Sequence, residues 1–140
     1  MKKLIIVFTL CLTFAYGQSI EIRVTQVKVD RIYQDLNIKS YVKNVNTTYY
    51  IDALNREVIV SFNKSDRNDV VFQNVKIQKI ENTYIVSYND ISLYTNDNHV
   101  GTITIDTKLN KVVYDDQNVD KNFSDVYDFQ VFDVVVRQPI

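Results

Sequence analysis

The sequence has little of several residue types that common catalytic and metal-binding motifs require. Its 140 residues include one cysteine, one histidine, two glycines and no tryptophan. Without a glycine-rich segment the chain can form no phosphate-binding loop, no dinucleotide-binding fingerprint and no nucleophile elbow. A zinc site normally gathers at least three histidine or cysteine ligands, which this composition cannot supply. We therefore expect a protein that is not an enzyme of these classes and that carries no cofactor.

Leucine and alanine are also scarce, and this scarcity bears on the fold class. Residues 18–140 contain five Leu and Ala together, against 33 Val and Ile. Branched side chains lose rotamer freedom against the preceding turn of a helix but fit the pleated surface of a strand. The composition therefore predicts an all-β protein.

The chain has no block of basic residues. Residues 18–140 carry 14 basic and 17 acidic side chains, and the two kinds are interspersed. Nucleic acids and anionic lipids are held mainly through clusters of positive charge. The charge pattern argues against a nucleic-acid partner and against a charged membrane surface.

The first 17 residues have the pattern of a secretory signal peptide. Lys2 and Lys3 form a basic start, an apolar run follows over residues 4–14, and Ala15 and Gly17 provide a small-x-small cleavage site. The apolar run is well short of the roughly 20 residues that a membrane-spanning helix needs. We predict an exported protein, periplasmic or extracellular, with no stable membrane span once the leader is removed. An uncleaved membrane anchor is the alternative.

Cleavage before Gln18 would remove the single cysteine, Cys11. The mature chain could then form no disulfide and no thiolate metal site, so its core alone must hold the fold. A leader followed directly by Gln resembles those of many small exported proteins of Gram-negative bacteria. The resemblance covers only the leader, and it implies an address and not an activity.

Residues 18–140 are predicted to form a single β domain. Alternation places Ile20, Ile22 and Val24 on one face, and Val27 and Val29 resume in the opposite phase. A slip of one residue indicates a β-bulge near residues 25–26. Residues 30–43 fit either a short helix or a strand, and we favour the strand.

The remaining segments follow a hairpin rhythm. We predict that residues 48–53 pair with 57–63, 69–80 with 83–94, and 100–107 with 111–115. A turn of helix is expected around residues 123–127, before a final strand over 129–136 that is central or covered on both faces. The whole is predicted to be a single antiparallel meander of about eight strands, either a small lipocalin-like barrel or a two-layer sandwich. Meander connectivity favours the barrel, which has no exposed edges and leaves room for one small ligand.

Two segments of the chain resemble each other, YYIDALNREVIV at residues 49–60 and ITIDTKLNKVVY at residues 103–114. We interpret them as two hairpins of the same kind, whose loops differ in length by one residue. Asp52 and Asp106 would accept hydrogen bonds from loop amides. Asn55 and Asn110 would take the left-handed backbone conformation that such loops require.

Polar residues offer few candidate sites. His99 lies in NDNHVG and is predicted to be a solvated loop residue. The oxygens of Asp115, Asp116, Asn118 and Asp120 could bind calcium, although the segment lacks the central Gly and closing Glu of the helix-loop-helix motif. A solvated acidic loop is the alternative.

Tyrosines on predicted strands offer a possible binding surface, because exposed Tyr provides amphipathic contact area. The alternative is that they are half-buried residues of the sheet. The candidates are Tyr49, Tyr50, Tyr84, Tyr88 and Tyr94.

Function is predicted only in outline. The leading hypothesis is an exported, non-catalytic interaction protein whose partner is an unknown protein or glycan. The second is a carrier of a small apolar ligand, which requires a cavity of several hundred Å³ in the barrel. The third is a carboxylate-based hydrolase, which requires two acids within about 10 Å in a concave site.

Overall fold

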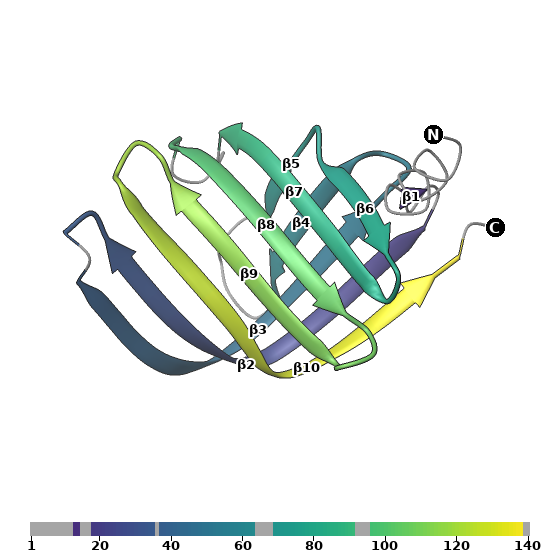
Figure 1. Cartoon of the computed structure of the whole chain (residues 1–140), viewed down its shortest axis with the longest axis horizontal. Helices are drawn as coiled ribbons and strands as arrows, with labels where there is room; N and C mark the ends of the chain where they lie inside the picture. The colour runs from purple at the N-terminus through teal and green to yellow at the C-terminus, as the bar shows by residue number, and fades with distance from the viewer. Residues whose placement is uncertain (1–12, 15–17, 36, 64–68, 92–95, 139–140) are drawn as a thin grey trace, which may run out of the picture.

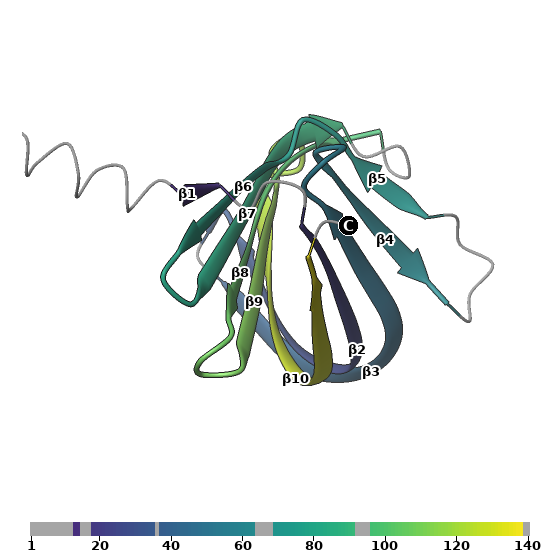
Figure 2. The ribbon, with the colours of Figure 1, turned by 90° about the vertical axis from the view of Figure 1, so that its right-hand side faces the viewer.

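The computed structural model is a single antiparallel sheet that curls into a half-barrel (Figures 1 and 2). It describes residues 13–14, 18–35, 37–63, 69–91 and 96–138, so the predicted leader lies largely outside the described residues. The all-β prediction is confirmed. The strands are β1 (Thr13–Phe14), β2 (Ser19–Tyr33), β3 (Ile38–Asp52), β4 (Glu57–Phe62), β5 (Val70–Phe72), β6 (Lys76–Ile80), β7 (Thr83–Ile91), β8 (Asn98–Asp106), β9 (Lys111–Asn118) and β10 (Phe123–Arg137).

The strand order is β1-β6-β7-β8-β9-β10-β2-β3-β4-β5. Strands β2 to β5 form one meander and β6 to β10 form another. The two meanders are joined by the long antiparallel pairing of β10 with β2. Strands β5 and β6 follow each other along the chain but do not pair. The gap in the half-barrel therefore lies between β5 and β6, whereas β2 and β10, which are far apart in the sequence, are hydrogen-bonded neighbours. The predicted antiparallel connectivity is present, but it is interrupted between β5 and β6, so the sheet contains two meanders and not one.

The core lies on the concave side of the sheet, where alternate branched residues of each strand point. Ile22, Val29, Val58, Val86 and Ile103 are fully buried there. Burying a side chain of this size stabilises a fold by about 1.5–3 kcal/mol, so these residues supply the main favourable term in a domain without disulfides. The predicted bulge is confirmed as a register shift between residues 24 and 26 in the pairing of β2 with β3.

Strand pairing settles the segments that the sequence left ambiguous or that we predicted wrongly. Residues 30–33 and 38–43 are strand, as favoured, and residues 30–32 pair with 38–40. The helical turn predicted at 123–127 is wrong, because β10 begins at Phe123 and pairs there with β9 on one side and β2 on the other. The prediction that the last strand is central or covered on both faces is wrong for residues 129–136. Strand β10 lies between β9 and β2, but its pairing with β9 ends at Asp128, and Val131 and Val135 beyond that point are exposed.

The predicted strand over residues 69–80 is wrong as a single element. It divides into β5, which pairs with β4, and β6, which pairs with β7. Asn74 between them has a φ of 56°, a left-handed conformation that ends regular pairing and that Asn tolerates better than most residues. This break separates the two ends of the half-barrel.

The two similar segments form hairpins of the same kind, and the Asp prediction is confirmed. Asp52 accepts hydrogen bonds from the amides of Leu54 and Asn55 at 3.0 and 3.2 Å. Asp106 accepts the corresponding bonds from the amides of residues 108 and 109 at 3.0 and 2.9 Å. A carboxylate at the strand end therefore holds each loop closed.

Left-handed backbone in these loops is only partly where we predicted it. Asn110 has a φ of 51°, but in the first loop the left-handed residue is Arg56, with a φ of 52°, and not Asn55. The loops have equal length, because Asp52 pairs with Glu57 just as Asp106 pairs with Lys111. Arg56 and Asn110 occupy the same position, and Asn55 instead donates from Nδ2 to Asp52 at 2.8 Å.

Candidate functional site

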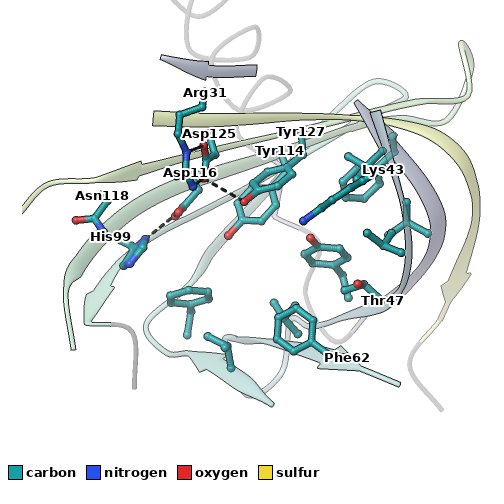
Figure 3. A pocket seen from close by; sticks show the side chains of 18 of the residues that line it. Arg31, Lys43, Thr47, Phe62, His99, Tyr114, Asp116, Asn118, Asp125 and Tyr127 are labelled. Atoms are coloured by element: carbon teal, nitrogen blue, oxygen red, sulfur yellow. Dashed lines mark hydrogen bonds and ion pairs between the residues drawn. The ribbon is translucent and has the colours of Figure 1, made fainter. Parts of the chain in front are cut away.

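The concave face holds an open cavity of about 740 Å³. Side chains from strands on both sides of the β10–β2 pairing line it, so it lies inside the curl of the half-barrel (Figure 3). Its walls combine apolar, aromatic and charged groups. The apolar and aromatic lining residues are Val24, Val27, Val45, Tyr49, Val60, Phe62, Val70, Phe72, Tyr114, Phe123, Tyr127 and Phe129.

Aromatic rings form a continuous wall of the cavity. Tyr49 of β3 lies edge-on to Tyr114 of β9, with ring centroids 5.6 Å apart, although two strands, β10 and β2, lie between them in the sheet. Tyr49 also lies 5.3 Å from Phe129, and Tyr114 lies 5.3 Å from Tyr127. Such pairs contribute about 0.5–1.5 kcal/mol each beyond the area they bury. The wall therefore offers ring faces and ring edges to an apolar or aromatic molecule.

A chain of hydrogen bonds links four polar side chains beside this wall. His99 Nδ1 lies 2.8 Å from Asp116 Oδ2, and the Tyr88 hydroxyl donates to Asp116 Oδ1 at 2.7 Å. The Tyr88 hydroxyl is also hydrogen-bonded to that of Tyr114. Tyr88 is placed for this because its cross-strand partner is Gly101. A Cβ at Gly101 would overlap the Tyr88 ring, so only glycine leaves room for it.

Burial and charge set the protonation of this chain. The hydrogen bond to Asp116 raises the pKa of His99, against the opposing effect of burial, and the charges of Asp97 and Asp120 add to the rise. Burial raises the pKa of Tyr88 and of Tyr114 well above the ordinary tyrosine range. Both tyrosines are therefore neutral phenols at any physiological pH.

A second charged pair lies next to the first. Arg31 binds Asp125 through two bonds, from Nε to Oδ1 at 2.7 Å and from Nη2 to Oδ2 at 2.9 Å. The Arg31 guanidinium also lies over the Phe123 ring, 4.3 Å from its centroid. These bonds to Asp125 raise the pKa of Arg31. Asp125 is 5% exposed and Arg31 binds both of its oxygens, so this is the strongest ion pair among the described residues.

Two nearly buried hydroxyl groups on β3 have no partner in the described chain. Thr47 and Tyr49 are each 7% exposed and line the cavity, and neither hydroxyl makes a hydrogen bond to a described residue. Neither oxygen is sealed from solvent. Lys43, on the same face of β3, lines the cavity without an ion pair to any residue that the structure describes. Figure 3 shows Lys43 and Thr47 on one side of the cavity, with His99 and Asp116 on the other.

At the rim, Asn118 and Lys121 meet Asp97. The Asn118 Nδ2 donates to Asp97 Oδ2 at 3.0 Å, and Lys121 Nζ lies 3.2 Å from the same oxygen. The Asn118 Oδ1 accepts a bond from the Lys121 amide at 3.0 Å. Asn118 thus holds the turn after β9 against the turn before β8.

The prediction that His99 is a solvated loop residue is wrong. His99 belongs to β8, its side chain is 12% exposed, and it pairs with Asp116 inside the cavity. The polar sequence around it resembles a loop because the strand begins at Asn98, whose amide bonds to Asp120 at 2.8 Å. A strand that begins inside a polar segment shows no alternation of apolar residues there, so the sequence pattern does not predict it.

The calcium candidates are divided by the alternation of β9. Asp116 and Asn118 point into the cavity and are buried, whereas Asp115 is exposed on the other face. Asp120 lies in the following turn and accepts the Asn98 amide. The described residues contain no cluster of three His, Cys, Asp or Glu side chains that could hold a metal.

The tyrosine candidates do not form one exposed surface. Tyr49, Tyr84 and Tyr88 are buried, and Tyr50 is half-buried on the outer face. Tyr94 lies outside the described residues. Of the five, Tyr49 lines the cavity.

Sequence reasoning missed most of the cavity, including Arg31, Lys43, Thr47 and Asp125. One signal was available in part. Alternation along β3 places Lys43, Val45, Thr47 and Tyr49 on one face, which shows two polar residues in positions that continue into the core. The partners across the cavity come from strands more than fifty residues away, and alternation alone cannot match them.

The fold and the cavity define a class, a small all-β protein with a barrel-like sheet and a pocket on its concave face. Comparison of the chain with models of protein families, with curated proteins and with solved structures finds no match. Among the described residues no helix has the length and apolar character to cross a bilayer.

Proposed function

We propose that this is an exported, non-catalytic binding protein that holds one small amphipathic ligand in the concave cavity. The observation that carries the proposal is a cavity of about 740 Å³ lined by Thr47 and Tyr49, two nearly buried residues whose hydroxyls no described residue engages. Cavities of about 300–1,000 Å³ are the size that encloses small molecules. Both hydroxyls are open to the cavity, so a bound ligand would replace solvent as their hydrogen-bond partner.

The chemistry of the lining favours an amphipathic ligand over the purely apolar one considered from the sequence. Aromatic rings and valines provide an apolar bed, while Lys43, Thr47 and Tyr49 add polar contacts along β3. A wholly apolar ligand would leave these groups desolvated and unpaired, at about 1–3 kcal/mol for each buried group.

Binding can be tested with Nile red, a neutral dye whose emission increases in apolar surroundings. We expect saturable binding by the chain from Gln18 onward. The variant Val45→Trp places a large ring in the cavity and should weaken binding at least tenfold. Val113→Trp is the matched control, because Val113 is also half-buried but lies on the outer face of β9, and it should bind as wild type does. Equal binding by both variants would contradict the proposal.

Export is tested separately, by the mass of the protein released from cells that express the whole chain. We expect a mature form beginning at Gln18. A released or membrane-bound form that retains Met1 would contradict the proposed address.

A carboxylate-based hydrolase remains the second candidate because one observation favours it. Asp116 and Asp125 are register partners on β9 and β10 and both line the cavity, so they place two carboxylates side by side, as acid-base hydrolysis requires. The hydrogen bonds around the two carboxylates favour a structural role over catalysis. Arg31 engages both oxygens of Asp125, and Tyr88 and His99 engage those of Asp116.

Nitrophenyl glycosides and esters test the hydrolase candidate directly. We expect no release of nitrophenol above the rate in buffer. Turnover that disappears in Asp116→Asn, a variant of nearly the same shape, would establish the hydrolase instead.

A further inference from the structure

The hydrogen-bond chain beside the cavity has a fixed direction. The Tyr88 hydroxyl donates to Asp116 Oδ1, and this bond uses the one hydroxyl proton of Tyr88. The bond between Tyr88 and Tyr114 must then use the proton of Tyr114. Tyr88 therefore donates to Asp116 and accepts from Tyr114.

This direction determines what Tyr114 can offer to a ligand. A phenol has one donor and a pair of acceptor positions, and the donor of Tyr114 is already engaged. Tyr114 lines the cavity, whereas Tyr88 does not. Burial keeps Tyr114 from ionising, so a neutral oxygen with acceptor capacity alone remains on this wall.

The rest of the cavity defines the surroundings of this acceptor. The ring of Tyr114 lies against those of Tyr49 and Tyr127, so a group that reaches the oxygen must lie along an aromatic surface. Thr47 and Tyr49 retain both donor and acceptor capacity, because their hydroxyls are not engaged by described residues. They can adapt to either kind of ligand group, and Tyr114 cannot.

We infer that the ligand carries an O–H or N–H group and donates it to the Tyr114 oxygen, with its apolar or aromatic body on the adjoining rings. This inference rests on the proposed binding function and names the chemical class of the ligand. Molecules that are equally apolar but present only an acceptor, such as ethers, should be selected against. A site built around a buried polar group discriminates strongly against analogues that cannot pair with it.

The paired probes 2-naphthol and 2-methoxynaphthalene differ mainly in that donor. Their affinities can be measured by displacement of Nile red. We expect 2-naphthol to bind at least about tenfold more tightly, a difference that corresponds to about 1.4 kcal/mol. In Tyr114→Phe the preference should fall to less than twofold, while Nile red still binds.

Tyr127→Phe is the matched control, because Tyr127 lines the same cavity but its hydroxyl is directed at Asp125 Oδ2, 3.4 Å away. It should keep the preference for 2-naphthol. The absorption band of bound 2-naphthol gives a second readout, since a naphthol that donates a hydrogen bond absorbs at longer wavelength. This red shift should be present in wild type and lost in Tyr114→Phe.

The outcomes separate the two proposals. If Nile red and both naphthalenes fail to bind, the proposed function is wrong and the inference fails with it. If the dye and both probes bind but with equal affinity, the inference alone is overturned. A preference that survives Tyr114→Phe, or that Tyr127→Phe removes as fully, also overturns it.

Discussion

The Phe72 ring of β5 stacks on the Tyr88 ring of β7, with centroids 3.9 Å apart and planes 14° from parallel. No backbone ladder joins β5 to β6 or β7 in the described sheet, so this stack connects its two ends. The amide of Gln73 adds a bond to Asp90 Oδ2 at 2.9 Å. Side chains thus hold the half-barrel in its curved form.

Removal of the stack should loosen this contact and lower stability. We expect Phe72→Ala to reduce the free energy of unfolding by about 3–4 kcal/mol, the cost of a buried Phe truncation. Urea unfolding measures it, and hydrogen exchange should show faster exchange of the β5 amides. Phe62→Ala, on neighbouring β4 and only half-buried, should cost clearly less. Equal losses would show that the stack has no special role.

Gly101→Ala should be destabilising although alanine is otherwise well tolerated in place of glycine. The new Cβ would overlap the Tyr88 ring, and moving the ring disturbs both its bond to Asp116 and its stack on Phe72. We expect a loss of about 1–3 kcal/mol, as for other overpacked sites. In a Tyr88→Leu background the same substitution should cost much less. A cost independent of residue 88 in thermal unfolding would contradict this account.

For the partly buried Arg31–Asp125 pair, removing one partner should cost more stability than replacing both. Arg31→Met leaves a nearly buried carboxylate without its cation and should cost about 2–3 kcal/mol, less than for a fully buried pair because the Arg31 side chain is 35% exposed. The double variant Arg31→Met, Asp125→Leu should recover most of that loss. A double-mutant cycle in urea measures both, and additive losses would rule out coupling.

Stability should depend on pH through His99. The pKa of His99 is raised in the folded state by Asp116, so the pair's contribution is fully present below the ordinary histidine pKa of 6.5 and is lost as pH rises through the higher folded value. We therefore expect wild type to lose its stability advantage over His99→Gln as the pH rises above 6.5 and through the raised pKa of the folded state. Melting temperatures of both forms across this range provide the check. An advantage that grows with pH would reverse the sign and refute the pairing.

Arg56 occupies a backbone conformation that suits glycine. A left-handed residue other than Gly costs roughly 1 kcal/mol, so Arg56→Gly should raise the free energy of unfolding by a few tenths to about 1 kcal/mol. Leu54→Gly, in the same loop and exposed but without positive φ, should lower it. Thermal unfolding of the two variants compares them, and a destabilised Arg56→Gly would contradict the argument.

Features of the fold that depend on near neighbours in the sequence could be predicted from it. Alternating valines and isoleucines identified the strands, and the phase change after Val24 identified the bulge. Asp52 and Asp106 were placed correctly because each bonds amides two and three residues away. Arg56 was missed because the aligned Leu-Asn pairs suggested loops of unequal length, whereas the closing strand pairs set the true register.

Features that depend on distant strands could not be predicted in the same way. Phe123 to Tyr127 reads as a possible helical turn until β2 and β9 are placed on either side of it. His99 and Asp116 meet because β8 and β9 pair, with a register that the sequence around His99 does not reveal. The candidate site consists almost entirely of contacts between distant strands. The sequence therefore predicted less of the site than of the fold.

The pairing of β10 with β2 also constrains the order in which the molecule can assemble. Ser19 is matched with Arg137, and Gln18 contacts Gln138 across a sequence separation of 120 residues. A ribosome must therefore synthesise nearly all of these strands before β2 meets one of its two neighbours, and closing so long a loop is slow. Until then each meander has an unpaired edge exposed, a state that chaperones or a delay in compaction would have to protect.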